Sequence, residues 1–203
     1  MLKAKIAVLV SGNGTNLQAL LDAEQAGQLP HGEIRLVVSS NPDAFALQRA
    51  QKAGKAAMFA ADEAATVALL QQYQIDVVVL AGYLKILSPA FVRLWPQRIL
   101  NVHPSLLPAF GGPGFYGLRV HQAALERGVK VTGATVHLVN ETPDGGPILR
   151  QQAVAVRPGD TPEILQKRVM EEAEWRLLPA ATEDVCRSWA ESMAPAAGKE
   201  PAQ

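Results

Sequence analysis

The side chains best suited to chemistry lie in the run Asn101-Val102-His103-Pro104-Ser105. Asn101 and His103 alternate with Val102, so in an extended segment both side chains point to the same side. Pro104 favours an extended backbone at His103. The Asn101 amide can donate to a developing oxyanion, and the His103 imidazole can donate or move a proton near neutral pH. The alternative is that Asn101 ends a strand and His103 caps a turn.

A third candidate, Asp144, lies in the glycine-rich run 143–147. A carboxylate beside an imidazole raises the pKa of the imidazole and can fix its orientation. A plain Asp-Gly turn is the alternative, and the sequence alone does not bring Asp144 to His103. His137 lies in an alternating run, 135–138, which favours packing in the core or on a sheet face over catalysis.

A loop of another kind, Ser11-Gly12-Asn13-Gly14-Thr15-Asn16, follows the apolar run Ile6–Val10. Thr15 and Gln18 are spaced as a capping box, which predicts a helix start. A strand, a glycine turn and a helix start gather free N–H groups that favour an anion. An ordinary turn is the alternative. Leu17 stands where a dinucleotide fingerprint needs glycine, and Gly-Lys-Ser/Thr is absent, so a small monophosphate is the better candidate.

The elements that must position these residues alternate between apolar runs and helical patterns. This alternation predicts an α/β fold with a Rossmann-like, mainly parallel twisted sheet and flanking helices. Ligands of such sheets bind beyond the carboxyl ends of the strands. We expect strands over 6–10, 34–38, 77–80 and 98–101, and helices over 17–25, 44–53 and 64–73.

The second half follows a different pattern, which predicts an antiparallel extension of the sheet. Residues 104–117 are dense in proline and glycine and favour irregular structure. Residues 140–146 carry turn chemistry between two longer strands. A tail, residues 195–203, is expected to be flexible. We expect strands over 129–139 and 147–156, and helices over 118–127, 161–178 and, after Pro179, 182–192.

Composition narrows the function classes. The 19 basic and 19 acidic residues balance, which gives no electrostatic case for a nucleic-acid partner. Cys186 is the single cysteine, so a disulfide framework and a cysteine-based zinc site are excluded, and no two histidines are spaced to hold a metal. The apolar run Ile6–Val10 is too short for a signal core or a membrane span. We expect a cytoplasmic protein without membrane partners and without a metal.

Four motifs resemble phosphoribosylglycinamide formyltransferases, the folate-dependent enzymes of purine synthesis. They are residues 11–18, 80–87, 101–108 and 144–147, in the family's order, and the resemblance runs from about residue 4 to 179. The resemblance implies the formyltransferase fold, with residues 1–194 as one domain. About 1–100 would form the phosphate-binding half, and about 101–194 the catalytic and folate-binding half.

The resemblance also implies a reaction and a role for each matching residue. The formyl group of 10-formyltetrahydrofolate, the co-substrate, would pass to the amine of phosphoribosylglycinamide without a metal. Asn101, His103 and Asp144 would be catalytic, with Asp144 keeping His103 oriented and more basic. The phosphoribosylglycinamide site would comprise Asn13, Gly14, Thr15, Asn16 and Glu174. The folate site would comprise Leu84, Lys85, Ile86, Leu87, Asn101, Asn140, Glu141, Thr142, Pro143 and Asp144.

Departures from the family pattern concern the folate side. Residues 60–65 lack an Arg that many members use for folate, Lys85 replaces a frequent Arg, and the loop 110–117 is a longer, glycine-rich variant.

Rival functions share the motif at 101–108. Methionyl-tRNA formyltransferases add a C-terminal barrel, and formyltetrahydrofolate hydrolases add an N-terminal regulatory domain, neither of which we expect here. A non-catalytic phosphosugar- or folate-binding module is the third alternative. The expected partners are small-molecule substrates, and the chain is expected to be a monomer or a homodimer.

Overall fold

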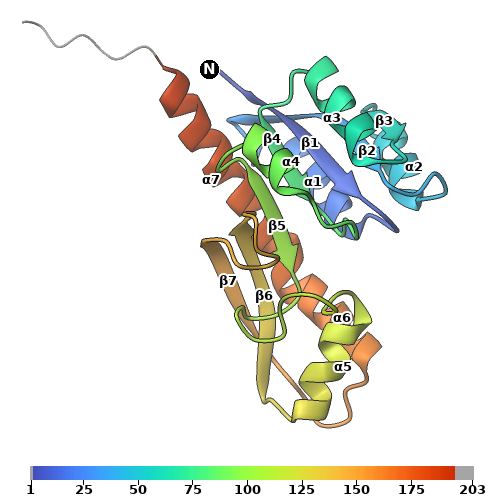
Figure 1. Cartoon of the computed structure of the whole chain (residues 1–203). Helices are drawn as coiled ribbons and strands as arrows, with labels where there is room; N and C mark the ends of the chain where they lie inside the picture. Colours follow the sequence, from blue (N-terminus) through green and yellow to red (C-terminus); the bar gives the residue numbers. More distant parts are fainter. Residues whose placement is uncertain (1, 195–203) are drawn as a thin grey trace, which may run out of the picture.

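Seven strands form one sheet in the order β3-β2-β1-β4-β5-β6-β7 within residues 2–194, the part of the chain that the computed structural model describes. β1 to β5 are parallel, whereas β6 runs antiparallel to β5 and β7 (Figure 1). The predicted sheet and its antiparallel extension are confirmed, and the predicted tail, 195–203, lies outside the described residues. The strands are β1 Ala4–Val10, β2 Gly32–Ser39, β3 Ala56–Phe59, β4 Val77–Leu80, β5 Ile99–His103, β6 Val131–Leu138 and β7 Ile148–Ala155.

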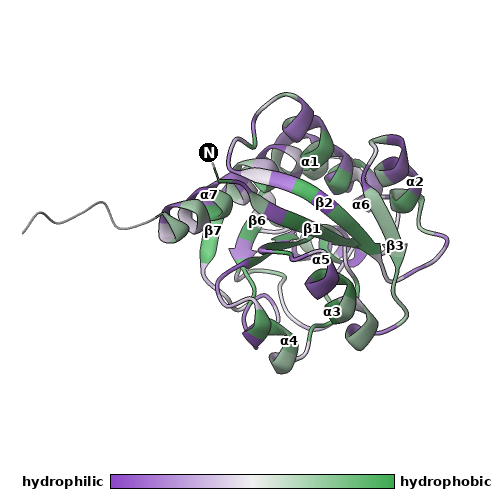
Figure 2. Cartoon of the chain, turned by 90° about the horizontal axis from the view of Figure 1, so that it is seen from above, coloured by the Kyte–Doolittle hydropathy of each residue, from purple (hydrophilic) through white to green (hydrophobic). Residues whose placement is uncertain are grey.

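Helices cover both faces of the sheet because its central strands are apolar on both sides (Figure 2). In β1, Ile6 and Val8 belong to one core, which α1, α2 and α7 close, whereas Ala7 and Leu9 belong to the core closed by α3 and α4. A smaller core lies between β6, β7 and α6. The helices are α1 Thr15–Gln25, α2 Phe45–Lys52, α3 Glu63–Gln72, α4 Pro89–Leu94, α5 Leu118–Arg127, α6 Pro162–Val169, the π-helix η1 Met170–Glu174 and α7 Trp175–Met193.

The start of α1 differs from the predicted capping box. The N-cap is Gly14 in the left-handed region (φ 75°), and no side chain caps the helix. The Thr15 hydroxyl instead points at the Met170 sulfur, 3.6 Å away. Glycine enters this conformation without a Cβ penalty, which explains the shift of the helix start by one residue. The first-turn N–H groups are thus left without a side-chain acceptor.

The C-terminal helices also differ from prediction. A break at Pro179 was expected between two helices, but α6, η1 and α7 follow one another directly, with Pro179 inside α7. Pro179 lies buried beside Leu178, which packs on the sheet. Packing of this face outweighs the lost hydrogen bond and the steric cost of proline in a helix.

Two short elements, β3 and α4, are absent from the prediction. β3 is a four-residue edge strand without a fully buried side chain. Its apolar run is too short to distinguish a strand from part of a helix by sequence pattern. α4 has six residues and is capped by Ser88, whose side chain accepts from the Phe91 N–H. The division of the domain into a phosphate-binding half and a catalytic half near residue 100 stays a prediction. The sheet itself continues across this point, because β4 pairs with β5. Within residues 2–194, no helix is long and apolar enough to cross a membrane.

Candidate active site

A cavity of about 450 Å³ lies at the carboxyl ends of β4 and β5. It brings together residues that are far apart in the sequence and that were predicted for three different roles. Four predicted residues, Asn13, Gly14, Thr15 and Thr142, do not line it. The predicted residues that do are Asn16, Leu84, Lys85, Ile86, Leu87, Asn101, His103, Asn140, Glu141, Pro143, Asp144 and Glu174.

Asn101 and His103 lie at the carboxyl end of β5. Their side chains point to the face opposite Val102, which packs in the core. Both face the cavity, as strand alternation predicts. Opposite them on β6, Asn101 pairs with His137 and His103 with Thr135. The neighbouring antiparallel strand therefore supplies side chains to the same polar cluster.

Asp144 reaches this cluster from the turn after β6. Its Oδ2 lies 3.5 Å from His103 Nδ1 and accepts from the Gly112 N–H at 2.8 Å, and its Oδ1 lies 3.5 Å from His137 Nε2. Burial raises the pKa of Asp144, but the contacts with His137, His103 and Gly112 lower it by more, so its pKa is below the usual value. The carboxyl group is ionised at neutral pH.

His103 is 4% exposed, and both of its ring nitrogens face acceptors. Nε2 lies 2.8 Å from the Phe110 carbonyl oxygen, and Nδ1 faces Asp144. Burial lowers the pKa of His103, and this outweighs the upward effects of Asp144 and the Phe110 carbonyl. Asp144 does make His103 more basic, as expected, but burial of the ring keeps the pKa of His103 below its ordinary value. The ring is neutral at neutral pH and keeps one N–H to donate.

His137 belongs to the cluster although its sequence favours packing. The ring is buried, with Nδ1 2.9 Å from the Leu138 carbonyl oxygen and Nε2 3.2 Å from Asn101 Nδ2. His137 Nε2 thus lies between the Asn101 amide and Asp144 Oδ1, which is 3.5 Å away, and links the two groups. This contact orients the Asn101 amide. The β5–β6 register, which sequence patterns do not reveal, would have indicated it.

Glu174 enters the cavity from the π-helix between α6 and α7. It is 6% exposed, and its Oε2 accepts from Asn16 Nδ2 at 2.6 Å. Burial raises the pKa of Glu174 to about 7, against the lowering effect of that hydrogen bond. The Asn16 Oδ1 atom is buried without a partner among residues 2–194. Met170, which sequence reasoning missed, lines the cavity from the other end of the π-helix, and π-helices often occur at functional sites.

At the far side of the cavity, apolar side chains are exposed. Leu84 and Ile86 are 64% and 74% exposed, although both line the cavity. The Leu84 N–H donates to Ser11 Oγ, which ties this segment to the loop before α1. Lys85 Nζ donates to the Ala61 carbonyl oxygen, so the one cation of the segment contacts residues 60–65, which contain no Arg.

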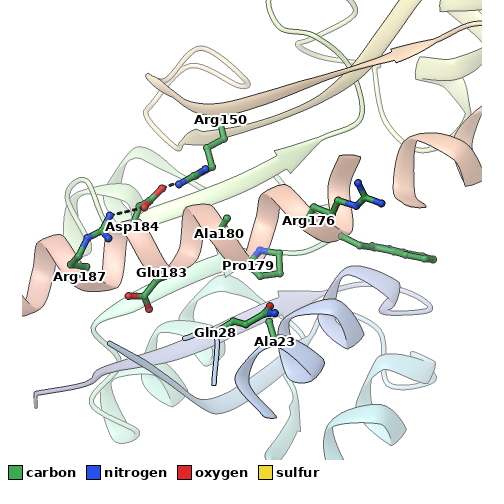
Figure 3. A pocket seen from close by; sticks show the side chains of 10 residues that line it. Ala23, Gln28, Arg150, Arg176, Pro179, Ala180, Glu183, Asp184 and Arg187 are labelled. Carbon is green, nitrogen blue, oxygen red and sulfur yellow. Dashed lines mark hydrogen bonds and ion pairs between the residues drawn. The ribbon is translucent and has the colours of Figure 1, made fainter. Parts of the chain in front are cut away.

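A second cavity, of about 460 Å³, lies between α1, α7 and β7 and contains none of the predicted site residues (Figure 3). Arg150 and Arg187 both donate to Asp184 there, at 2.7 and 2.8 Å. Asp184 is thus held in ion pairs with both arginines, and this cavity offers no free carboxylate at Asp184 for catalysis. The catalytic candidates therefore remain those of the first cavity. Among the residues described, no three His, Cys, Asp or Glu side chains gather as metal ligands would.

Comparison with known proteins shows the family and the fold of the chain. The sequence profile of the formyl transferase family matches residues 4–182. The phosphoribosylglycinamide formyltransferase of Escherichia coli (strain K12) is 44% identical over 173 residues, covering 81% of this chain and 79% of that protein. Glycinamide ribonucleotide transformylase 1 from Symbiobacterium toebii has a crystal structure with a TM-score of 0.84 at 42% identity, covering 92% of this chain and 89% of that chain.

The chain belongs to the phosphoribosylglycinamide formyltransferase family. It is therefore an enzyme, and formyl transfer in purine biosynthesis is the activity of its family. The family resemblance and the fold expected from the sequence are thereby confirmed. The chloroplastic phosphoribosylglycinamide formyltransferase of Arabidopsis thaliana is 40% identical, covering 95% of this chain and 70% of that protein. The trifunctional purine biosynthetic protein adenosine-3 of Gallus gallus is 42% identical, and the chain spans 18% of its length.

Proposed function

We propose that this formyltransferase moves the formyl group of 10-formyltetrahydrofolate to the amine of 5′-phosphoribosylglycinamide. The products would be formylglycinamide ribonucleotide and tetrahydrofolate, in de novo purine (IMP) biosynthesis. The observation that carries the proposal is one cavity lined by Asn16 and Glu174 from one side and by Leu84–Leu87 from another, with Asn101 and His103 lining it as well. Two small-molecule substrates can meet there, and the chain itself would act as a monomer or a homodimer.

The ribonucleotide would bind at the start of α1. Its phosphate would accept from the uncapped N–H groups at Gly14, Thr15 and Asn16, and the first turn of the helix contains no acidic residue. Asn13 would lie beside the phosphate. Its ribose hydroxyls would donate to Glu174. The unpartnered Asn16 Oδ1 atom is a further acceptor for a donor of the same substrate.

The folate would cover the exposed side chains of Leu84 and Ile86, which suits a flat, largely apolar ring system. Backbone groups of the 84–87 segment and of the turn 140–144 offer hydrogen bonds at the ring edge. Lys85 is the cation that lines this cavity, and it would face the carboxylates of the folate tail. The folate site would comprise Leu84, Lys85, Ile86, Leu87, Asn101, Asn140, Glu141, Thr142, Pro143 and Asp144.

The reaction follows from the polar cluster. The glycinamide amine attacks the formyl carbon and forms a new C–N bond, and the bond between the formyl carbon and folate N10 breaks when the tetrahedral intermediate collapses. The free N–H of Asn101 and the N–H of His103 stabilise the oxyanion of the tetrahedral intermediate, and His103 first gives up its contact with the Phe110 carbonyl. Asp144 orients His103. The amine loses one proton and N10 gains one, through water, with the ionised Asp144 as an acceptor in the same cavity.

The test is an absorbance assay of 10-formyltetrahydrofolate with the wild-type chain, run with and without phosphoribosylglycinamide. Folate release that requires the ribonucleotide supports the transferase. Release without it indicates a hydrolase, and no release under either condition indicates a binding module or a different amine acceptor. Either of the last two results would refute the proposal.

A further inference from the structure

We infer that Arg49, on α2, is a positioning residue for the phosphate of the ribonucleotide. The inference rests on the proposed function, because it assigns a part of the same substrate site. Arg49 lies outside the motif at 11–18 and does not line the cavity, so neither its sequence context nor the cavity indicates it. What indicates it is a set of contacts that join α2 to the loop before α1.

The Arg49 guanidinium forms three hydrogen bonds to this region. Nε donates to the Asn13 carbonyl oxygen at 2.8 Å, Nη2 to Asn13 Oδ1 at 3.4 Å, and Nη1 to Gln18 Oε1 at 3.1 Å. One rigid fork thus binds the residue before the N-cap and a residue in the first turn of α1. Because a planar guanidinium fixes the directions of its N–H groups, these contacts set where Asn13 lies relative to the helix start.

Close packing of α2 adds to this constraint. The Ala46 N–H donates to the Gly12 carbonyl oxygen at 3.1 Å, and a Cβ on Gly14 would lie only 2.6 Å from Ala46 Cβ. The Arg49 guanidinium lies over the Phe45 ring, with Arg49 Cζ 4.9 Å from the ring centroid. α2 therefore packs against residues 12–14 and limits their movement. Arg49 is the charged residue of α2 that contacts this loop.

That charge has the right sign for the ligand. A phosphate monoester carries close to two negative charges at neutral pH, whereas backbone N–H groups at a helix start offer only partial positive charge. Arginine has five N–H donors, and two of those on Arg49 make no hydrogen bond with any residue of the described part of the chain. Arg49 therefore holds the anion site in shape and adds a full positive charge beside it.

Steady-state kinetics of Arg49→Ala, Arg49→Lys and a matched control test this role. Lys52→Ala is the control, because Lys52 is a cation of the last turn of the same helix and, within residues 2–194, makes no hydrogen bond to the loop. We expect Arg49→Ala to raise the KM for the ribonucleotide about tenfold, equivalent to about 1.4 kcal/mol. kcat and the KM for folate should change less than twofold. The constant for competitive inhibition by inorganic phosphate should rise by the same factor as the ribonucleotide KM.

Arg49→Lys should recover only part of the loss, because it restores the charge without the fork. A ribonucleotide KM within twofold of wild type in Arg49→Ala, or an unchanged phosphate inhibition constant, would overturn the inference. If Arg49→Ala does not fold, the ribonucleotide KM of Arg49→Lys decides in the same way, with the folate KM as its internal reference. A wild-type chain without ribonucleotide-dependent folate release would instead overturn the proposed function, and the two failures are thus distinguishable.

Discussion

Replacement of His121 by leucine should remove much of the acid sensitivity of the fold. His121 lies on α5 with no exposed surface, and neither ring nitrogen has a partner among residues 2–194. Burial and, to a smaller extent, the nearby His103 lower the pKa of His121 from 6.5 to about 4. Leucine has a similar volume and no polar atoms, so it can occupy the site without desolvating a nitrogen.

The sign and size of the effect follow from proton linkage. Below its ordinary pKa the unfolded chain takes up a proton at His121 that the folded chain refuses, so the free energy of unfolding falls as the pH falls. The stability of the fold is unaffected by His121 protonation above pH 6.5, and it decreases progressively as the pH falls from 6.5 toward 4. The loss reaches about 3 kcal/mol when fully expressed and is about 2 kcal/mol between pH 8 and pH 5.

Urea unfolding followed by tryptophan fluorescence at pH 8 and pH 5 measures this difference. The wild-type chain should lose about 2 kcal/mol more than His121→Leu over that interval, with an unchanged dependence on urea concentration. Contributions from other groups are common to both proteins and cancel in the comparison. Equal pH dependence of the two proteins would refute the assignment of a buried, neutral His121.

Two further predictions concern the active site. Asn101→Ala should lower kcat about 10²- to 10³-fold with little change in stability, because it removes an oxyanion donor; a fall below tenfold in steady-state assays would contradict that role. In the wild type, the KM for the ribonucleotide should rise as the pH falls below about 7, because the Glu174 carboxylate becomes protonated and accepts less well. Glu174→Gln should abolish this rise, and a pH profile that is the same in both proteins would contradict the assignment.

Several elements could be predicted because one local rule determines each of them. β1 and β4 are apolar on both faces and read as continuous apolar runs. α5 ends where Gly128 takes the left-handed conformation, with φ 74°. Asn101 and His103 share a side because strand alternation has a period of two residues. In each case the deciding residues are neighbours in the chain.

The remaining features depend on contacts between distant segments. Asp144 approaches His103 only because β6 pairs antiparallel with β5 and the turn after it folds back. The same pairing brings His137 to Asn101. The π-helix that presents Glu174 has no sequence signature of its own, and Pro179 stays inside a helix because its neighbours are buried. Tertiary packing, which propensities do not contain, decides these positions.

The central claim is the transfer of a formyl group between two small molecules, and isotopic labelling tests it most directly. The chain would be incubated with 10-formyltetrahydrofolate labelled in the formyl carbon and with phosphoribosylglycinamide, and the products would be separated and analysed by mass spectrometry. We expect the label in formylglycinamide ribonucleotide, in equal amount to the tetrahydrofolate released. Label recovered as free formate, or left on the folate, would contradict the claim.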